Sequence, residues 1–293
     1  MIVALVLVPA IARGDAELDK KLQALVAEPG DAVQAGIWFG PAGAPIYQLA
    51  ADRAMPAASV VKTAILIELF AAHAGHLDEP LGAAADAILT EDKHPAMTPF
   101  SAGQRGEIRG ALHGATVSTI GAIMMGSQKA SNAVYNAAAN LAIAALGGPG
   151  DATAKIHARD PAFTGIAVGR YMLASRTASD NAATPASLAA VLASIATGKL
   201  AGVDAATVTA IANAMMHGND ALGVDHHKEG NLDSDPMVCI KTGYYARGDG
   251  KPPVVYVVGA ALSGKPSTGR DAAHRRLDKL TNALHAALRA AVR

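Results

Sequence analysis

Apolar runs of strand-like composition lie near the two ends of the chain. In the N-terminal part, residues 32–40 and 45–52 are short runs rich in β-formers, and the turn-like segment between them predicts a hairpin. In the C-terminal part, residues 236–246 and 252–262 predict two more strands, followed by a helix from about Asp271. Strands at both ends that enclose a different middle predict one sheet built from the two termini.

The middle of the chain has helical periodicity. Apolar positions recur at helical spacing through residues 115–126, 131–148 and 184–198, and an earlier helix is predicted over residues 17–28. We therefore expect an α/β (α+β) fold with an antiparallel sheet flanked by helices and an all-helical subdomain. The predicted single domain covers residues 17–293, with an α/β subdomain of 17–58 and 195–293 and a helical subdomain of 59–194.

The segment from Ser59 to Gly75 predicts a helix of another kind, because its apolar residues cover every face. Such a helix should be buried, yet Lys62 lies within it, three residues after Ser59. Burial disfavours the ammonium form of lysine, and a lysine whose pKa is lowered can accept the proton of a nucleophilic serine. The alternative is a serine that caps the helix and a lysine that extends its amine to solvent. An S-x-x-K spacing alone does not decide between them.

Charge and composition narrow the class of partner. Twenty-five basic residues balance twenty-five acidic ones, which does not favour a nucleic-acid or anionic-membrane binder. We expect a small-molecule substrate, no cofactor and a monomer. Cys239 is the only cysteine, so an intrachain disulfide and a cysteine-based zinc site are excluded.

The N-terminus has features of an export signal. Residues 2–12 form an apolar run, and Ala10-Ile11-Ala12 fits a small-x-small cleavage site before a polar stretch. The run is too short to span a bilayer, and we expect no membrane span. The prediction is a signal segment over residues 1–12 and an exported, periplasmic or extracellular protein; the alternative is a buried strand.

A second motif lies in the predicted strand of residues 236–246. Lys241-Thr242-Gly243 places a lysine in an apolar run, where it is expected only at an edge or facing a cleft. With Ser59 and Lys62, this motif resembles the penicillin-recognising serine hydrolases. The resemblance is to class A β-lactamases, which carry S-x-x-K on a buried helix, S-D-N in the helical subdomain and K-T-G on a strand.

The resemblance implies a β-lactamase/transpeptidase-like fold and a role for each matched residue. Ser59 would attack the carbonyl of a β-lactam or an acyl-D-alanyl peptide, and Lys62 would act as base or proton relay. Lys241 and Thr242 would bind the substrate carboxylate. The backbone N–H groups of Ser59 and of Tyr244, which follows Gly243, would form the oxyanion hole.

The S-D-N motif is degenerate in this chain. The best alignment to the family's S-D-N-x-x-x-N places Ala130, Ser131 and Asn132 over S-D-N, with Asn136 four residues further on. Alanine would then replace the serine that passes a proton to the leaving nitrogen. Ser131 or Ser127 would have to substitute for it, or Ser131 only caps the helix. Asn132 is the expected substrate-binding residue.

The glutamate that activates the deacylating water in class A enzymes is missing. The family pattern counts back from Pro185 to Val168, and no acidic residue lies between Asp160 and Asp180. Because general-base help is worth about 10² to 10⁴ in rate, its loss predicts weak turnover and a long-lived acyl-enzyme. Asp180 is a possible replacement.

One further cluster carries potential ligands. Residues 215–230 contain His217, Asp220, Asp225, His226 and His227, which are of types that bind divalent metals. Their polar, glycine-containing context instead favours a solvated loop, and we predict no metal.

The sequence therefore predicts a serine hydrolase that opens β-lactam amides. Two alternatives remain: a penicillin-binding D,D-peptidase or another amidase or esterase on the same fold, and a noncatalytic descendant that binds or acts as a scaffold.

Overall fold

The computed structural model describes residues 16–27, 31–176, 179–248 and 250–292 of the chain. The helical elements are α1 (Ala16–Val26), η1 (Ala58–Val61), α2 (Lys62–Ala72), α3 (Ala83–Thr90), α4 (Ala102–Leu112), α5 (Val117–Met125), α6 (Asn132–Ala145), α7 (Pro149–Arg159), η2 (Pro161–Phe163), α8 (Pro185–Ala196), α9 (Ala205–Ala214) and α10 (Arg270–Ala290), where η marks a 3₁₀ turn. The strands are β1 (Val33–Pro41), β2 (Tyr47–Leu49), β3 (Met55–Pro56), β4 (Ile166–Ala167), β5 (Ala182–Ala183), β6 (Met216–Asp220), β7 (Gly223–Leu232), β8 (Met237–Ala246) and β9 (Val254–Leu262).

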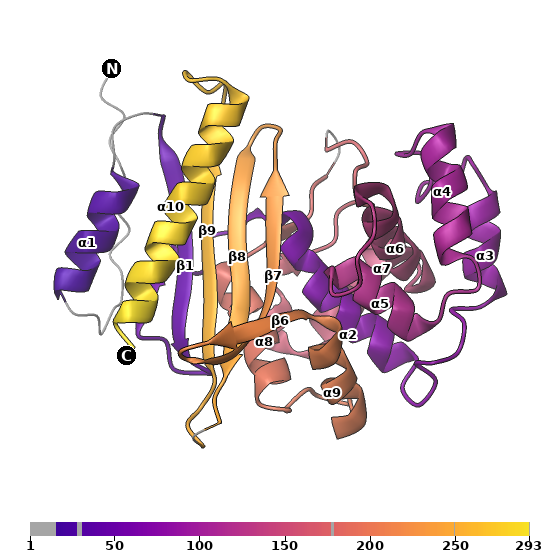
Figure 1. Ribbon diagram of the computed structural model, residues 1–293, viewed down its shortest axis with the longest axis horizontal. Helices are drawn as coiled ribbons and strands as arrows, with labels where there is room; N and C mark the ends of the chain where they lie inside the picture. Colours follow the sequence, from indigo (N-terminus) through magenta and orange to yellow (C-terminus); the bar gives the residue numbers. More distant parts are fainter. Residues whose placement is uncertain (1–15, 28–30, 177–178, 249, 293) are drawn as a thin grey trace.

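The two ends of the chain form one antiparallel sheet, as the apolar pattern predicted. Its strand order is β2-β1-β9-β8-β7-β6, so β1 from the N-terminal part lies beside β9 from the C-terminal part (Figure 1). The β1–β9 register runs from Val33 opposite Leu262 to Pro41 opposite Val254. The predicted hairpin is confirmed by the antiparallel pairing of β1 with β2. A small second sheet, β3-β5-β4, lies in the helical region.

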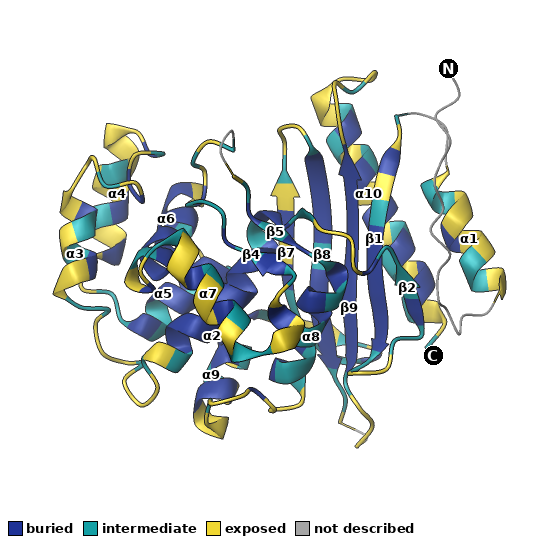
Figure 2. Cartoon of the chain, turned by 180° about the vertical axis from the view of Figure 1, so that it is seen from behind, coloured by how far each residue is buried: buried dark blue, intermediate teal, exposed yellow. Residues whose placement is uncertain are grey.

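Side chains of the large sheet alternate between two cores. Along β8, Val238, Ile240 and Tyr244 belong to the core shared with the helical region, whereas Cys239 and Tyr245 belong to the core beneath α1 and α10. The two-residue period of a strand produces this alternation. Helix α10 crosses one face of the sheet in Figure 1, and α8 crosses the other in Figure 2, which is seen from behind. Even-numbered and odd-numbered residues of β8 therefore enter different cores.

The helical region confirms the local signals in the sequence. Thr184 is the N-cap of α8 and accepts a hydrogen bond from the Ser187 N–H at 3.1 Å, with Pro185 at the first helical position. Residues 62–70 of α2 are all buried, as expected for a helix that is apolar on every face. None of the helices within the described ranges is long and apolar enough to cross a membrane. The predicted signal segment, residues 1–12, lies outside those ranges.

The segment predicted as a solvated loop is instead part of the sheet. Residues 216–220 and 223–232 form β6 and β7, which pair from Met216 opposite His227 to Asp220 opposite Gly223. The sequence did not predict these strands because they carry His, Asp, Lys, Glu and Asn where a half-buried strand normally has apolar side chains. Strands β6 and β7 therefore extend the sheet beyond β8, so β8 is an inner strand.

Candidate active site

Ser59 lies in the short turn η1, at the entrance to α2. It is half-buried, and the residue before it, Ala58, has a φ of 47°, in the left-handed region that residues with a Cβ rarely adopt. Such a backbone costs about 1 to 3 kcal/mol and persists only where the surrounding structure holds it. Here it brings Ser59 against strand β7.

Gly230 of β7 allows that contact. A Cβ at position 230 would lie 2.9 Å from the Ser59 nitrogen and 3.0 Å from the Ala58 Cβ, both on the chain that bears the serine. A glycine is therefore required for β7 to approach the turn so closely. The strand that packs against Ser59 is β7.

Lys62 is fully buried, with 0% of its surface exposed. Its Nζ donates a hydrogen bond to Asn136 Oδ1 at 3.0 Å and lies 3.2 Å from the centroid of the Tyr135 ring. Burial, and secondarily the charge of Lys228, hold the pKa of the Lys62 amine well below its usual value of 10.5. The lysine is thus placed in the electrostatic setting of a proton acceptor, one helical turn from Ser59.

A second buried lysine shares this cluster. Lys228 of β7 is 5% exposed, and its Nζ lies 5.3 Å from the centroid of the Tyr135 ring and donates to the Glu229 carbonyl oxygen at 2.8 Å. Two amines therefore face one aromatic ring, which can stabilise cationic charge. The charge of Lys228 also makes protonation of Lys62 less favourable.

The expected Lys-Thr-Gly motif occupies the next strand, β8, and this corrects its predicted role. Lys241 projects toward the α10 side, where it pairs with Glu229 at 2.6 Å. Thr242 is buried and donates to the Lys228 carbonyl oxygen at 2.8 Å. The threonine hydroxyl is thus engaged in holding β8 to β7.

The remaining two residues of that prediction contact β7. A Cβ on Gly243 would lie 2.4 Å from the His226 carbonyl oxygen, so this glycine allows β7 and β8 to pack together. Tyr244 is buried and stacks on His226, with ring centroids 4.8 Å apart. Strand β7 lies between the predicted motif and η1, and Gly230 is its residue against the serine turn.

The predicted S-D-N residues lie one helical turn before the α6 residue that contacts the lysine. Ser131 is the exposed N-cap of α6 and accepts from the Val134 N–H at 3.3 Å. Asn132 accepts a hydrogen bond from Asn136 Nδ2 at 3.0 Å, and it is Asn136 that contacts Lys62. The Ser127 hydroxyl donates to a backbone carbonyl oxygen of α9 at 2.7 Å. The predicted alignment is therefore wrong by four residues.

The family spacing S-D-N-x-x-x-N falls on Val134-Tyr135-Asn136 and Asn140 in the structure. Asn132, Asn136 and Asn140 are spaced four residues apart on α6, so the sequence offers two equivalent alignments and only the contact with Lys62 chooses between them. Val134 has no hydroxyl, so the relay serine is absent at the corrected position as well.

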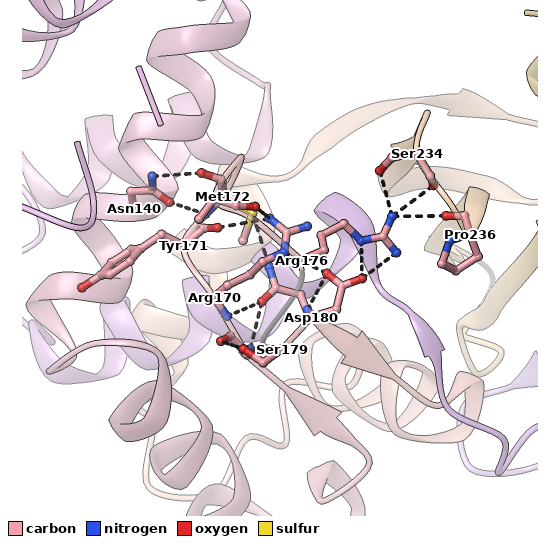
Figure 3. Close-up of polar contacts among 12 residues, drawn as sticks. Asn140, Arg170, Tyr171, Met172, Arg176, Ser179, Asp180, Ser234 and Pro236 are labelled. Carbon is pink, nitrogen blue, oxygen red and sulfur yellow. Dashed lines mark hydrogen bonds and ion pairs between the residues drawn. The ribbon is translucent and has the colours of Figure 1, made fainter. Parts of the chain in front are cut away.

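In the segment after α7, the carboxylate expected to replace the missing glutamate is paired with arginines. Asn140 holds Met172, donating to its carbonyl oxygen at 3.2 Å and accepting from its N–H at 2.6 Å (Figure 3). Asp180, the proposed replacement for the missing glutamate, is paired with Arg170 at 2.9 Å and Arg176 at 2.7 Å. Both oxygens of this carboxylate are therefore engaged by guanidinium groups of the same segment.

Arg176 also ties this segment to the sheet. Its guanidinium donates to the carbonyl oxygen and hydroxyl of Ser234, at 3.0 and 2.9 Å, and to the Pro236 carbonyl oxygen at 3.3 Å, in the turn between β7 and β8 (Figure 3). The sequence analysis missed this residue, together with Tyr135, Lys228 and Gly230, and named Asn136 only as the last asparagine of the S-D-N-x-x-x-N pattern. A Lys-x-Gly triplet in residues 228–230 was the available signal.

The histidine-rich segment is accounted for by β6 and β7. His226 packs between His217 and Tyr244, and His227 lies 3.3 Å from the Asp225 carboxylate. Across the part of the chain that the structure describes, no group of three or more His, Cys, Asp or Glu residues is arranged to hold a metal ion.

Comparisons with known proteins relate this geometry to a family. A model of the Beta-lactamase enzyme family matches residues 17–249. A search of curated proteins finds no match. Among solved structures, a β-lactamase from Desulfarculus baarsii is similar to this chain with a TM-score of 0.65 and 18% identity, over 92% of this chain and 96% of that one.

Two further structures are similar in fold. The class A β-lactamase of the last common ancestor of Gram-negative bacteria has a TM-score of 0.64 and 18% identity, over 93% of this chain and 99% of that one. A structure described as PBP-A has a TM-score of 0.60 and 16% identity, over 97% of this chain and 99% of that one. At these identities the likeness shows the fold, which is that of class A β-lactamases.

Proposed function

Because this chain belongs to the β-lactamase enzyme family, we propose that it is a serine hydrolase that opens β-lactam amides, or related acyl-D-alanyl amides, through an acyl-enzyme on Ser59. The observation that carries the proposal is the fully buried Lys62, whose amine has a lowered pKa and lies one helical turn from the serine. A neutral amine in that position can take the hydroxyl proton as the serine attacks.

The proposed acylation needs no group beyond those in the cluster. Ser59 Oγ forms a bond to the carbonyl carbon, its proton passes to Lys62 Nζ, and the carbon–nitrogen bond of the lactam then breaks. Lys62 returns the proton to the leaving nitrogen, because Val134 offers no hydroxyl for a relay. The developing oxyanion would be held by the backbone N–H groups of Ser59 and of Asn231, the residue after Gly230.

Slow deacylation is the second part of the proposal. The carboxylate of Asp180 is paired with two arginines. The residue that Asn140 holds is a methionine, Met172, whose side chain cannot act as a base. Without a free carboxylate to activate water, the acyl-enzyme should persist about 10² to 10⁴ times longer than with a general base. This feature also favours the second candidate, a penicillin-binding enzyme that is acylated stoichiometrically, and PBP-A is a structure of similar fold.

Intact-protein mass spectrometry after incubation with benzylpenicillin tests the proposal. We expect one adduct of the mass of the antibiotic, located on Ser59, that is absent in Ser59→Ala and decays slowly. Rapid hydrolysis of a chromogenic cephalosporin would support an efficient lactamase instead. No adduct with either reagent would contradict acylation and favour the noncatalytic descendant.

We also propose that the protein is exported. The apolar segment of residues 2–12 and its small-x-small site support this. N-terminal sequencing of the protein from its native host should then give a chain that begins near residue 13.

A further inference from the structure

Acylation of Ser59 would create a positive charge inside the protein. As the proton leaves Ser59 Oγ and joins Lys62 Nζ, a neutral amine becomes an ammonium group on a side chain that is fully buried. Water cannot solvate that charge, and an uncompensated buried charge is costly. Groups of the protein must therefore stabilise it as the proton arrives.

Most of the groups around Lys62 do not meet this need. Asn136 accepts a hydrogen bond from Nζ at 3.0 Å, which a neutral amine can donate as well. Lys228, the charged residue from β7, disfavours the ammonium form of Lys62. Helices α5, α6 and α9, which pack against α2, contain no charged residue, and Arg159 of α7 pairs with Glu68 further along α2. In the described part of the chain, Lys62 is thus not paired with a carboxylate.

The ring of Tyr135 is placed to supply the missing stabilisation. Lys62 Nζ lies 3.2 Å from the ring centroid, over the face, where the quadrupole of an aromatic ring is negative. Because the lysine is buried, the contact is desolvated, and a desolvated cation–π contact is stronger than an exposed one. Tyr135 and Asn136 are neighbours on α6, so one helix brings both partners to the amine.

A ring face suits a lysine that has to change its charge. A carboxylate would hold Lys62 as an ammonium group before the substrate arrives, and the amine could then not take a proton. The ring stabilises the charged form less than an ion pair does, so burial keeps the amine neutral at rest. The same ring still stabilises the positive charge when it forms.

We propose that the face of the Tyr135 ring takes the place of a carboxylate counter-charge, stabilising the ammonium group that forms on Lys62 as Ser59 is acylated. This inference rests on the proposed acylation of Ser59. It assigns Tyr135 as a positioning residue that acts through Lys62 and needs no contact with the substrate.

The test changes the ring and leaves the lysines in place. The second-order rate constant for acylation of Ser59 by benzylpenicillin is measured by mass spectrometry between about pH 5 and pH 10. Tyr135→Phe keeps the ring face and is the matched control, with the rate and pH profile of the wild type. Tyr135→Leu should lower the rate at the high-pH plateau about tenfold and move the rise to lower pH, because the ammonium form of Lys62 loses its stabilisation.

A second ring variant keeps the test decisive if Tyr135→Leu does not fold. Pentafluorophenylalanine incorporated at position 135 has nearly the shape of phenylalanine, but its fluorine atoms reverse the quadrupole of the ring face. It should slow acylation and move the pH profile in the same direction as Tyr135→Leu. Thermal melts establish which variants are folded.

A wild-type pH profile in the folded variants that lack a negative ring face would overturn the inference, and adducts on Ser59 would leave the proposed function intact. An equal loss in Tyr135→Phe would also overturn the inference, because the hydroxyl would then be the acting group. The absence of adducts in the wild type would overturn the proposed function and the inference together.

Discussion

At the scale of single residues, the site is defined by two lysines around one tyrosine. Lys62 has no carboxylate partner within the described cluster; its contacts are the amide of Asn136 and the face of the Tyr135 ring. Both favour an ammonium group only weakly compared with an ion pair, so burial and the charge of Lys228 prevail and lower the Lys62 pKa. Lys62 is thus suited to accept a proton because no carboxylate in the cluster stabilises its charged form.

This arrangement predicts the pH dependence of acylation. The reactive form of Lys62 is the neutral amine, so the acylation rate should rise with pH and level off below the usual lysine pKa of 10.5. Lys228→Met removes a positive neighbour, raises the pKa of Lys62 and should move the rise to higher pH. An uncharged probe, benzylpenicillin methyl ester, keeps the loss of charge from affecting probe binding directly.

Lys199→Met, at an exposed position, serves as the control for this experiment and should reproduce the wild-type profile. A profile in Lys228→Met that stays in place or moves to lower pH would contradict the electrostatic account of Lys62.

At the scale of elements, the decisive contact is between β7 and the turn η1. Gly230 permits it, and the left-handed backbone of Ala58 is found at the same contact. Gly230→Ala would place a methyl group against the Ser59 backbone, so that β7 and the serine must separate. We expect acylation to fall about a hundredfold, the loss typical of a 1 Å misplacement, and stability to fall by about 1 to 3 kcal/mol.

Gly218→Ala on the neighbouring strand β6 is the matched comparison, because a Cβ there meets nothing within 4 Å. Acylation kinetics and chemical denaturation of the two variants measure the difference. Equal behaviour of Gly230→Ala and Gly218→Ala would show that β7 does not position the serine.

The elements also show how far the sequence could predict this site. The buried helix after Ser59, the Thr184 cap and both strands β8 and β9 followed from local pattern, because each has a periodicity or capping signal of its own. Strand β7 did not, since its side chains meet other polar groups, aromatic rings or solvent rather than a continuous apolar core. The motif was therefore assigned to β8, the apolar strand beside it.

The asparagine register failed for a different reason. Asn132, Asn136 and Asn140 follow one another at intervals of four residues, about one helical turn. All three have the same amide side chain, so the sequence does not distinguish their hydrogen-bonding capacity. Only the distance from Lys62, which comes from α2, distinguishes Asn136 from its neighbours. Such information is tertiary and is not contained in the spacing.

At the scale of the whole molecule, α10 covers the sheet on the side opposite the site, and a polar cluster lies beneath it. His285 of α10 is hydrogen-bonded to the Tyr245 hydroxyl at 3.0 Å and its ring lies 4.2 Å from that of Tyr256. Burial, followed by the charge of Arg289, lowers the pKa of His285 to about 4. Between about pH 4 and pH 6.5, the folded protein thus keeps this imidazole neutral, whereas an unfolded chain would protonate it.

This cluster predicts acid sensitivity of the fold. A histidine whose pKa is lower in the folded state loses its stabilising contribution as pH falls below its unfolded pKa of about 6.5, and the loss is complete near pH 4. The free energy of unfolding should fall by up to about 3 kcal/mol over that range from this residue. His285→Gln keeps a polar side chain without a titrating group, so its stability should fall less over the same range in urea denaturation.

A parallel loss in wild type and His285→Gln between pH 7 and pH 4 would contradict this assignment. His157→Gln, on α7, is the control, because it removes an imidazole that is also hydrogen-bonded but lies outside this cluster.

The central pairing of β1 with β9 has a consequence for biosynthesis. More than two hundred residues separate these partners along the chain, from Val33 to Leu262, and contacts between distant segments form slowly because a long loop must first close. A nascent chain has no β9 to offer until residues 254–262 have been synthesised. Until then strand β1, with Ile37 and Phe39 that are buried in the folded protein, has no β9 to pair with, and its apolar surface is exposed to aggregation.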